Sequence, residues 1–233
     1  AKLKNNYLPF RYVSGCKYGS KDILLNQFIG EDLVVFLIAF ATFSPSSIAG
    51  ITLLWLSFFS IYEIGYYEND AAPSKWEKKQ NLPKKFPIFS NYKIHYGWIY
   101  GLFFGVMGVL LLGKASFSTL TIWFGVLIMT RTTFYIFNKL PPRKRIFAFP
   151  ALQVLKTFSI ATILPLQTAG IAILGAQVLR QTTNYNLYRH GGDTSRFLRQ
   201  SHRLVAFIML SIMLYSVVDI RDTLLSASWV IGL

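Results

Sequence analysis

Acidic residues in the first third of the chain are the strongest candidates for chemistry. The sequence holds only ten Asp and Glu residues, and Glu63, Glu68 and Asp70 lie close together in one Tyr-rich segment. On a helix, Glu63, Tyr67 and Asp70 are four and three residues apart and therefore share one face. A carboxylate within an apolar segment is costly unless it faces a wet cavity or a cation. Because carboxylate oxygens are common ligands of divalent cations, the pattern indicates a divalent-cation site near Asp70.

Two cations lie within apolar segments further along the chain. Arg131 precedes the basic segment 139–145 by about two helical turns, and Lys156 lies at a similar depth after it. Such cations either pair with a carboxylate and hold helices together, or line a path for a substrate, and the residues alone leave both open. Acids beside cations would suit a phosphate or diphosphate leaving group. We expect Asp70 and Arg131 to face one polar cavity that opens to the cytoplasm.

A second polar group follows near residue 185. Tyr185 and Arg189 are four residues apart, so on a continuing helix both side chains reach the same place. Gly191-Gly192 provides a turn, and Arg196 follows at the start of the next helix. A solvated basic loop would have the same spacing, so this pattern indicates either a loop or a second wall of the site.

The amino-acid composition indicates that these residues belong to a membrane protein. Apolar residues make up 53% of the 233 and charged residues only 15%, yet the formal net charge is +14. A soluble domain has about a quarter of its residues charged, so these values exclude a disordered chain and an ordinary cytosolic enzyme. The single cysteine, Cys16, excludes a disulfide scaffold. The basic charge matches anionic lipid head groups, and we expect no nucleic acid as a partner.

The expected elements are membrane helices of about 17–25 residues, separated by basic loops. Most Lys and Arg residues fall in four segments, and basic loops stay cytoplasmic, so an even number of crossings joins each neighbouring pair. Ser44 to Ser47 and Leu164 to Thr168 read as turns between crossings. The predicted crossings are hairpins at 31–68, 94–137 and 147–180, followed by one more crossing at 203–219. The prediction is an all-α polytopic membrane helix bundle of about seven spans, in the inner or plasma membrane with a cytoplasmic N-terminus.

The same pattern divides the chain into three parts. Residues 1–30 form a basic cytoplasmic or interfacial segment, residues 31–219 form the transmembrane helical domain, and residues 220–233 form a tail or partial span.

Several short motifs in this order are typical of one family of membrane enzymes. Asn69-Asp70 ends the Tyr-rich segment, and a basic segment that contains Asn81-Leu82-Pro83 follows. Further along come Tyr135-x-x-Asn138-Lys139-Leu140, Lys156, Tyr185-x-x-x-Arg189 and the run from Gly192 to Arg199. From about residue 27 to 203 the chain resembles the UbiA superfamily of intramembrane transferases. Its second loop is most similar to the polyprenyl-phosphate phosphoribosyltransferase branch.

The resemblance implies a helical bundle that uses Mg²⁺ to transfer groups to or from polyprenyl chains. The first motif of the family is Asn-Asp-x-x-Asp-x-x-x-Asp, whereas here Pro73 replaces the second Asp and Glu77 takes the last position. The implied metal ligands are Asn69, Asp70, Glu77 and Glu63, with Glu68 as an alternative. The implied phosphate-binding residues are Arg131, Lys156, Arg189 and Arg196. The implied catalytic residues are Asp70, Tyr185 and Arg189, with Tyr185 orienting the reacting group.

The function expected from this resemblance is Mg²⁺-dependent transfer at the cytoplasmic face. The expected partners are a polyprenyl phosphate or diphosphate, a small phosphorylated or aromatic co-substrate, and membrane lipids. Two alternatives remain open. The first is a catalytically degenerate subunit with the same fold, which Pro73 favours, and the second is a lipid-binding or transport protein.

Overall fold

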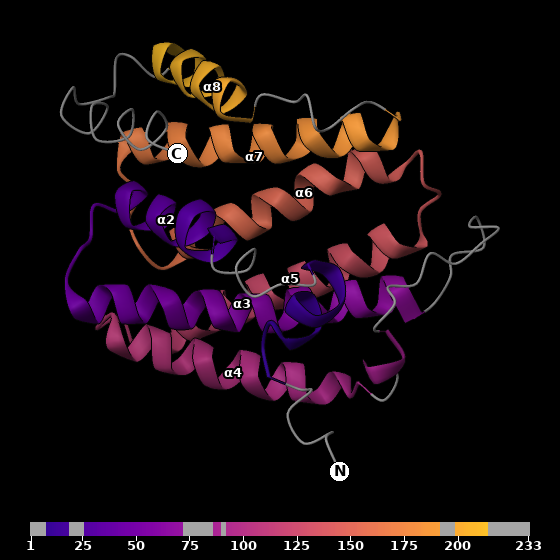
Figure 1. Ribbon diagram of the computed structural model, residues 1–233. Coiled ribbons are helices and arrows are strands. Elements are labelled where there is room, and N and C mark those ends of the chain that lie inside the picture. Colours follow the sequence, from indigo (N-terminus) through magenta and orange to yellow (C-terminus); the bar gives the residue numbers. More distant parts are fainter. Residues whose placement is uncertain (1–7, 19–25, 72–85, 90–91, 192–198, 214–233) are drawn as a thin grey trace.

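Most of the part of the chain that the structure describes folds into helices. The computed structural model describes residues 8–18, 26–71, 86–89, 92–191 and 199–213, and within these ranges no β-strand occurs (Figure 1). In chain order the elements are η1 (Val13–Tyr18), η2 (Asn26–Leu33), α2 (Val34–Ala39), α3 (Pro45–Ala71), η3 (Phe86–Phe89), α4 (Ile94–Leu111), α5 (Phe117–Lys139), α6 (Arg145–Phe158), η4 (Ser159–Thr162), α7 (Thr168–Arg189) and α8 (Arg199–Met213). The all-α prediction is confirmed for these residues.

Within the described residues, three helices are long and apolar enough to cross a membrane. They are α3 with 27 residues, α4 with 18 and α5 with 23. The outer sides of α4 and α5 expose large apolar side chains, among them Phe103, Phe117 and Ile128, as a surface in contact with lipid would require. The crossing expected at 31–43 corresponds to the end of η2 and the six-residue α2, which are shorter than the roughly 20 residues that span a bilayer. The crossing expected at 203–219 begins in α8 and continues outside the described residues.

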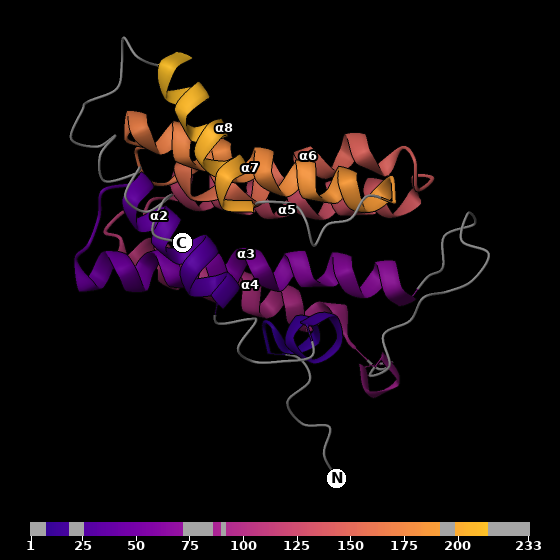
Figure 2. The same ribbon diagram turned by 45° about the horizontal axis from the view of Figure 1, so that its top comes forward.

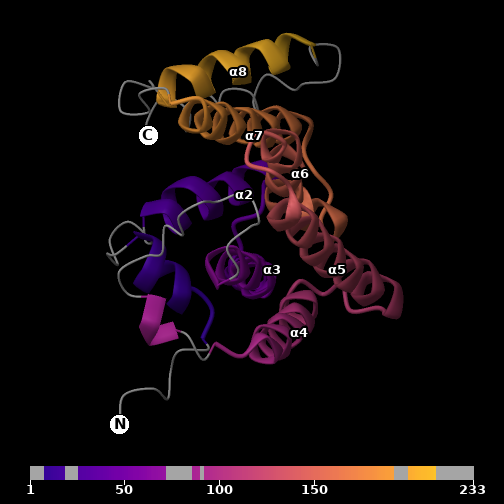
Figure 3. The same ribbon diagram turned by 90° about the vertical axis from the view of Figure 1, so that its right-hand side faces the viewer.

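The helices are arranged around α3. Seen along the bundle, α4, α5, α6 and α7 follow one another around one side of α3, and α2 lies on the other side (Figure 3). The most extensive contact joins α3 to α4, and α8 packs on the outer side of α7 (Figure 2). Because α3 is surrounded, its side chains form the centre of the buried core.

Both turns expected within the longest apolar segments are present. Pro45 begins α3, where the fixed φ of proline suits the first helical position, and Ser44 Oγ accepts the backbone N–H of Ser47 at 3.2 Å. The other turn separates η4 from α7, and the Gln167 N–H donates to the Ala39 carbonyl at 3.1 Å. These turns reverse the chain and place α2 beside the start of α7.

The backbones of α3 and α4 approach closely because α4 presents glycine to α3. A Cβ atom at Gly97 would lie 2.8 Å from the Ile64 side chain and 3.0 Å from the Ser60 carbonyl oxygen. Ser57 Oγ on α3 donates to the Gly101 carbonyl at 2.5 Å and accepts Trp123 Nε1 on α5 at 2.9 Å. The buried glycines of α4 are Gly97, Gly101, Gly105 and Gly108. Small residues and interhelical hydrogen bonds of this kind hold membrane helices together.

The helix ends that adjoin the basic segments lie at one end of the bundle. Consecutive helices from α3 to α7 run in opposite directions, so the end of α3, the α5–α6 connection and the end of α7 lie together (right-hand side of Figure 1). The candidate residues near these ends are therefore brought into one half of the bundle.

Candidate functional site

Glu63 is fully buried in α3 and holds the N-terminal segment. Its carboxylate accepts the backbone N–H of Phe10 at 3.0 Å and that of Val13 at 2.7 Å, one on each oxygen. These amides belong to the first turn of a helical segment, where backbone N–H groups have no partner within the helix. Glu63 therefore acts as a capping side chain that comes from a different helix.

Asp70 lies two turns further along α3 and contacts the same segment. The Tyr12 hydroxyl, which is fully buried, donates a hydrogen bond to the Asp70 carboxylate. Burial, and then the hydrogen bond to Asp70, raise the pKa of Tyr12 above its ordinary value. Asn69 Nδ2 lies 3.5 Å from the other oxygen of Asp70. The acidic face thus exists as the spacing predicts, and the N-terminal segment covers it.

This arrangement differs from the metal-ligand set that the resemblance implies. Both oxygens of Glu63 and one oxygen of Asp70 already accept hydrogen bonds from residues 10–13. Within the described ranges, no three His, Cys, Asp or Glu side chains come together as a metal site would require. Glu77 lies outside those ranges. A magnesium site at Asn69, Asp70 and Glu77 stays a prediction, and Glu63 as arranged does not fit it.

Arg131 projects from α5 toward a different acid. Its guanidinium forms an ion pair with Glu68, and both side chains are partly exposed. Asp70 contacts Tyr12, so the contacts that the structure describes place Arg131 and Asp70 with different partners. Joint binding of a phosphate group by Arg131 and Asp70 stays a prediction.

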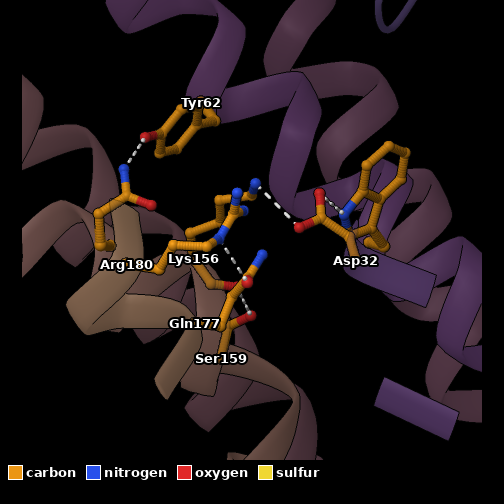
Figure 4. Close-up of polar contacts among 8 residues, drawn as sticks. Asp32, Tyr62, Lys156, Ser159, Gln177 and Arg180 are labelled. Atoms are coloured by element: carbon orange, nitrogen blue, oxygen red, sulfur yellow. Dashed lines mark hydrogen bonds and ion pairs between the residues drawn. The ribbon is translucent and has the colours of Figure 1, made fainter. Parts of the chain in front are cut away.

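Lys156 is buried in α6 and is held by an acid from the start of the chain. Its Nζ lies 2.9 Å from Asp32 Oδ1, and Trp55 Nε1 donates to Asp32 Oδ2 at 3.3 Å (Figure 4). The pair joins η2 to α6, and Trp55 adds α3. Of the two roles left open for Lys156, the structure shows the ion pair, with Asp32 as the partner.

Lys156 also lines a cavity between α3, α6 and α7. The cavity has a volume of about 190 Å³ and is lined by Phe59, Tyr62, Tyr66, Phe149, Gln153, Lys156 and Gln181. Gln153 Nε2 lies 3.4 Å from the Tyr62 hydroxyl. Aromatic walls with a few placed polar groups are typical of ligand pockets, which commonly enclose about 300–1,000 Å³ for a whole drug-sized ligand. The volume here suits the head of a larger ligand.

Arg180 adds a second buried cation to the same polar group. It lies on α7 at 4% exposure, and its Nε donates to Gln177 Oε1 at 3.2 Å. Figure 4 shows Lys156 and Arg180 within one cluster of polar side chains, with Tyr62 and Asp32 on opposite sides of it. The cluster can present two positive groups to an anion in this part of the bundle.

Tyr185 and Arg189 lie beside the cavity, with one ring between. Helix α7 continues to Arg189 as expected, and Arg189 Nε donates to the Tyr185 hydroxyl at 2.8 Å. The Phe149 ring stacks on the Tyr185 ring with centroids 3.9 Å apart, and Phe149 also lines the cavity. The Tyr185–Arg189 pair is therefore a neighbour of the polar cluster around Lys156. Arg196, its remaining member, lies outside the described residues.

Sequence reasoning missed several residues of this cluster. Arg180 stands at the edge of a basic segment and reads there as a loop residue, although Gln177, Arg180, Gln181 and Asn184 lie at positions i, i+3, i+4 and i+7 of α7 and so share one face. That polar face was the available signal. Asp32, Tyr62 and Gln153 gave none, because single polar residues in apolar segments have many possible partners.

Comparison with known proteins assigns neither a family nor a function to this chain. Neither the protein-family models, nor the curated proteins, nor the solved structures that were searched match the chain. Function must therefore be argued from the cavity and its surroundings.

Proposed function

We propose that this protein is a UbiA-like membrane transferase that binds the phosphate or diphosphate head of a polyprenyl lipid in the cavity between α3, α6 and α7. The observation that carries the proposal is the position of Lys156, which is buried in a bundle of apolar helices and yet lines a cavity. Ionisable groups inside a membrane domain commonly mark the path of a polar or charged substrate.

The polar and aromatic groups of the cavity have separate roles in this proposal. Lys156 in the cavity lining and Arg180 in the adjoining polar cluster bind phosphate oxygens. Where a diphosphate head leaves as its carbon–oxygen bond to the prenyl group breaks, both cations stabilise the charge that grows on the departing diphosphate. Tyr62 and Gln181 contribute hydrogen bonds. Phe59 and Phe149 pack against the first apolar units of the lipid, whose remaining length lies outside a cavity of this size.

The Tyr185–Arg189 pair orients the small co-substrate. It adjoins the cavity through Phe149, so a co-substrate bound there would approach the lipid head from the α7 side. The topology that we propose has about seven spans and a cytoplasmic N-terminus, which places the basic helix ends and the co-substrate on the cytoplasmic side. A requirement of turnover for Mg²⁺ remains part of the proposal through Asn69, Asp70 and Glu77.

Native mass spectrometry of the purified protein tests this function. We expect a bound species whose mass corresponds to a prenyl chain of discrete length with a phosphate head. Lys156→Gln should lose that species, whereas Lys144→Gln, which removes the same charge from an exposed turn, should keep it. Co-purification of ordinary phospholipids alone, to equal extents in both variants, would contradict the proposal.

A second candidate is a catalytically degenerate subunit that keeps the lipid site. The use of Glu63 and Asp70 to hold residues 10–13 favours it. Asp70→Asn separates the two candidates, because an amide oxygen can still accept the Tyr12 hydroxyl while the charge is lost. With transferase activity measured on a prenyl phosphate, loss of turnover in a stable Asp70→Asn protein supports an enzyme. Lipid binding without turnover in the unaltered protein supports the subunit.

A further inference from the structure

We propose that the cavity binds a prenyl phosphomonoester head without a metal ion, using side-chain donors alone. This inference rests on the function proposed above and makes it more specific. It separates binding of the head, which the cavity carries out, from any later step that uses Mg²⁺ at the acidic face of α3.

The acids Glu63 and Asp70 are not among the described residues that line the cavity. Mg²⁺ sites usually combine one or two carboxylates with the phosphates of the substrate. Here Glu63 and Asp70 face residues 10–13, on a side of α3 where their oxygens accept hydrogen bonds from Phe10, Tyr12 and Val13. None of the described residues that line the cavity is a carboxylate. A phosphate in the cavity would therefore meet no arranged metal ligand among them.

Several hydrogen-bond donors line the cavity. Lys156 provides an ammonium group, Tyr62 a hydroxyl, and Gln153 and Gln181 provide amide groups. Asp32, at 2.9 Å, holds Lys156 in place from the side of η2 (Figure 4). Charged and neutral donors fixed in a partly desolvated site bind an oxyanion more strongly than they would in water.

The size of the cavity limits the size of the head group that it can hold. A cavity of about 190 Å³ accepts a head group rather than a whole ligand. A diphosphate is normally bound together with Mg²⁺, whose usual carboxylate ligands the lining lacks. A phosphomonoester, with one phosphate and less charge, matches the donors present.

The experiment measures binding of farnesyl phosphate to the full chain in lipid nanodiscs, with either excess EDTA or excess Mg²⁺. We expect dissociation constants that agree within about twofold under the two conditions, and binding of farnesol that is weaker by about tenfold or more, since a charge-assisted hydrogen bond contributes at least that factor. Inorganic phosphate alone should bind more weakly than farnesyl phosphate, because it lacks the apolar contacts.

Two variants place the binding in this cavity. Gln181→Glu keeps the shape of the side chain and adds a negative charge to the lining, and we expect it to weaken farnesyl phosphate binding by about tenfold or more. Lys156→Gln should have a similar effect, but it also removes the partner of Asp32, so Gln181→Glu is the variant on which the test depends. Lys144→Gln is the matched control for loss of a positive charge.

The outcomes separate the inference from the function on which it rests. Binding that needs Mg²⁺ would overturn the metal-free head site and leave a polyprenyl-phosphate function standing. Equal binding of farnesol and farnesyl phosphate, or no binding under either condition, would overturn both. Inorganic phosphate that binds as tightly as the lipid would show a site for a free anion, and unchanged binding in Gln181→Glu would show a site elsewhere; either result overturns the inference.

Discussion

The hydroxyl of Tyr12 donates a hydrogen bond to the carboxylate of Asp70, which lies 58 residues later in the chain. The Tyr12 ring also meets the edge of Tyr67 and of Phe89, at centroid distances of 5.7 and 5.4 Å. A residue that the resemblance assigns to metal binding is thus part of a contact between the N-terminal segment and α3. Because of this contact, Tyr12→Phe can test the contribution of the contact to stability, while Asp70→Asn tests the role of the carboxylate in activity.

Removal of the Tyr12 hydroxyl should destabilise the protein. Tyr12→Phe keeps the ring and leaves a buried carboxylate without this donor, and we expect a loss of about 1.5–3 kcal/mol, as for hydrogen bonds to charged groups. Thermal unfolding in detergent measures it. Tyr135→Phe is the control, because Tyr135 is exposed and its hydroxyl accepts a hydrogen bond from the exposed Lys139 side chain. Equal effects of the two substitutions would contradict the importance of the Tyr12 contact.

The same tyrosine should make the protein sensitive to alkaline pH. Burial and Asp70 raise the pKa of Tyr12 above the ordinary value of 10.0, and burial also raises that of Tyr92. Above about pH 10 the unfolded chain loses these protons while the folded chain keeps them, so the free energy of unfolding falls as pH rises. Chemical denaturation between pH 8 and 11 measures the slope. The slope should be smaller in Tyr12→Phe; an unchanged slope would contradict the assignment.

The Lys156–Asp32 pair should show strong coupling in a double-mutant cycle. Each single change, Lys156→Gln or Asp32→Asn, leaves one buried charge without its closest partner, and we expect a cost of roughly 2–4 kcal/mol. The double variant should cost less than the sum of the two, because no unmatched charge of this pair remains. Denaturant unfolding of all four proteins measures the coupling. Additive effects would mean that the pair contributes no net attraction.

The approach of α3 and α4 should not tolerate a side chain at Gly97. Gly97→Ala places a Cβ atom 3.0 Å from the backbone oxygen of Ser60, which cannot move away alone, and we expect a loss of about 1–3 kcal/mol. Gly125→Ala on α5 is the matched control, since nothing lies within 4 Å of its Cβ position. In a helix interior that change should be neutral or stabilising by up to about 1 kcal/mol. Helix association measured by thermal unfolding distinguishes the two.

Periodicity predicted the parts of the site that lie within single helices. Glu63, Tyr67 and Asp70 do share a face, and Tyr185 and Arg189 do meet on α7. Turn chemistry likewise predicted the reversals before α3 and before α7. These features depend on residues a few positions apart, for which spacing alone is sufficient information.

The partners of those faces could not be predicted in the same way. The sequence indicated a carboxylate as one possible partner of Lys156 and Arg131 without saying which, and the structure pairs Lys156 with Asp32 and Arg131 with Glu68. Helical spacing fixes which residues share a face, but it does not say which distant segment packs there. The number of membrane crossings could not be predicted from spacing either. The apolar segments that form η2 with α2, and α6 with η4, end where they pack against neighbouring helices, and the sequence does not show those positions.

The capping of residues 10–13 by Glu63 has a consequence for synthesis. The amides of Phe10 and Val13 are made 53 and 50 residues before the carboxylate that accepts them. They therefore leave the ribosome before Glu63 does, and this cap can form only once translation has reached α3. The order of residues 10–13 thus depends on a segment that is made later than they are.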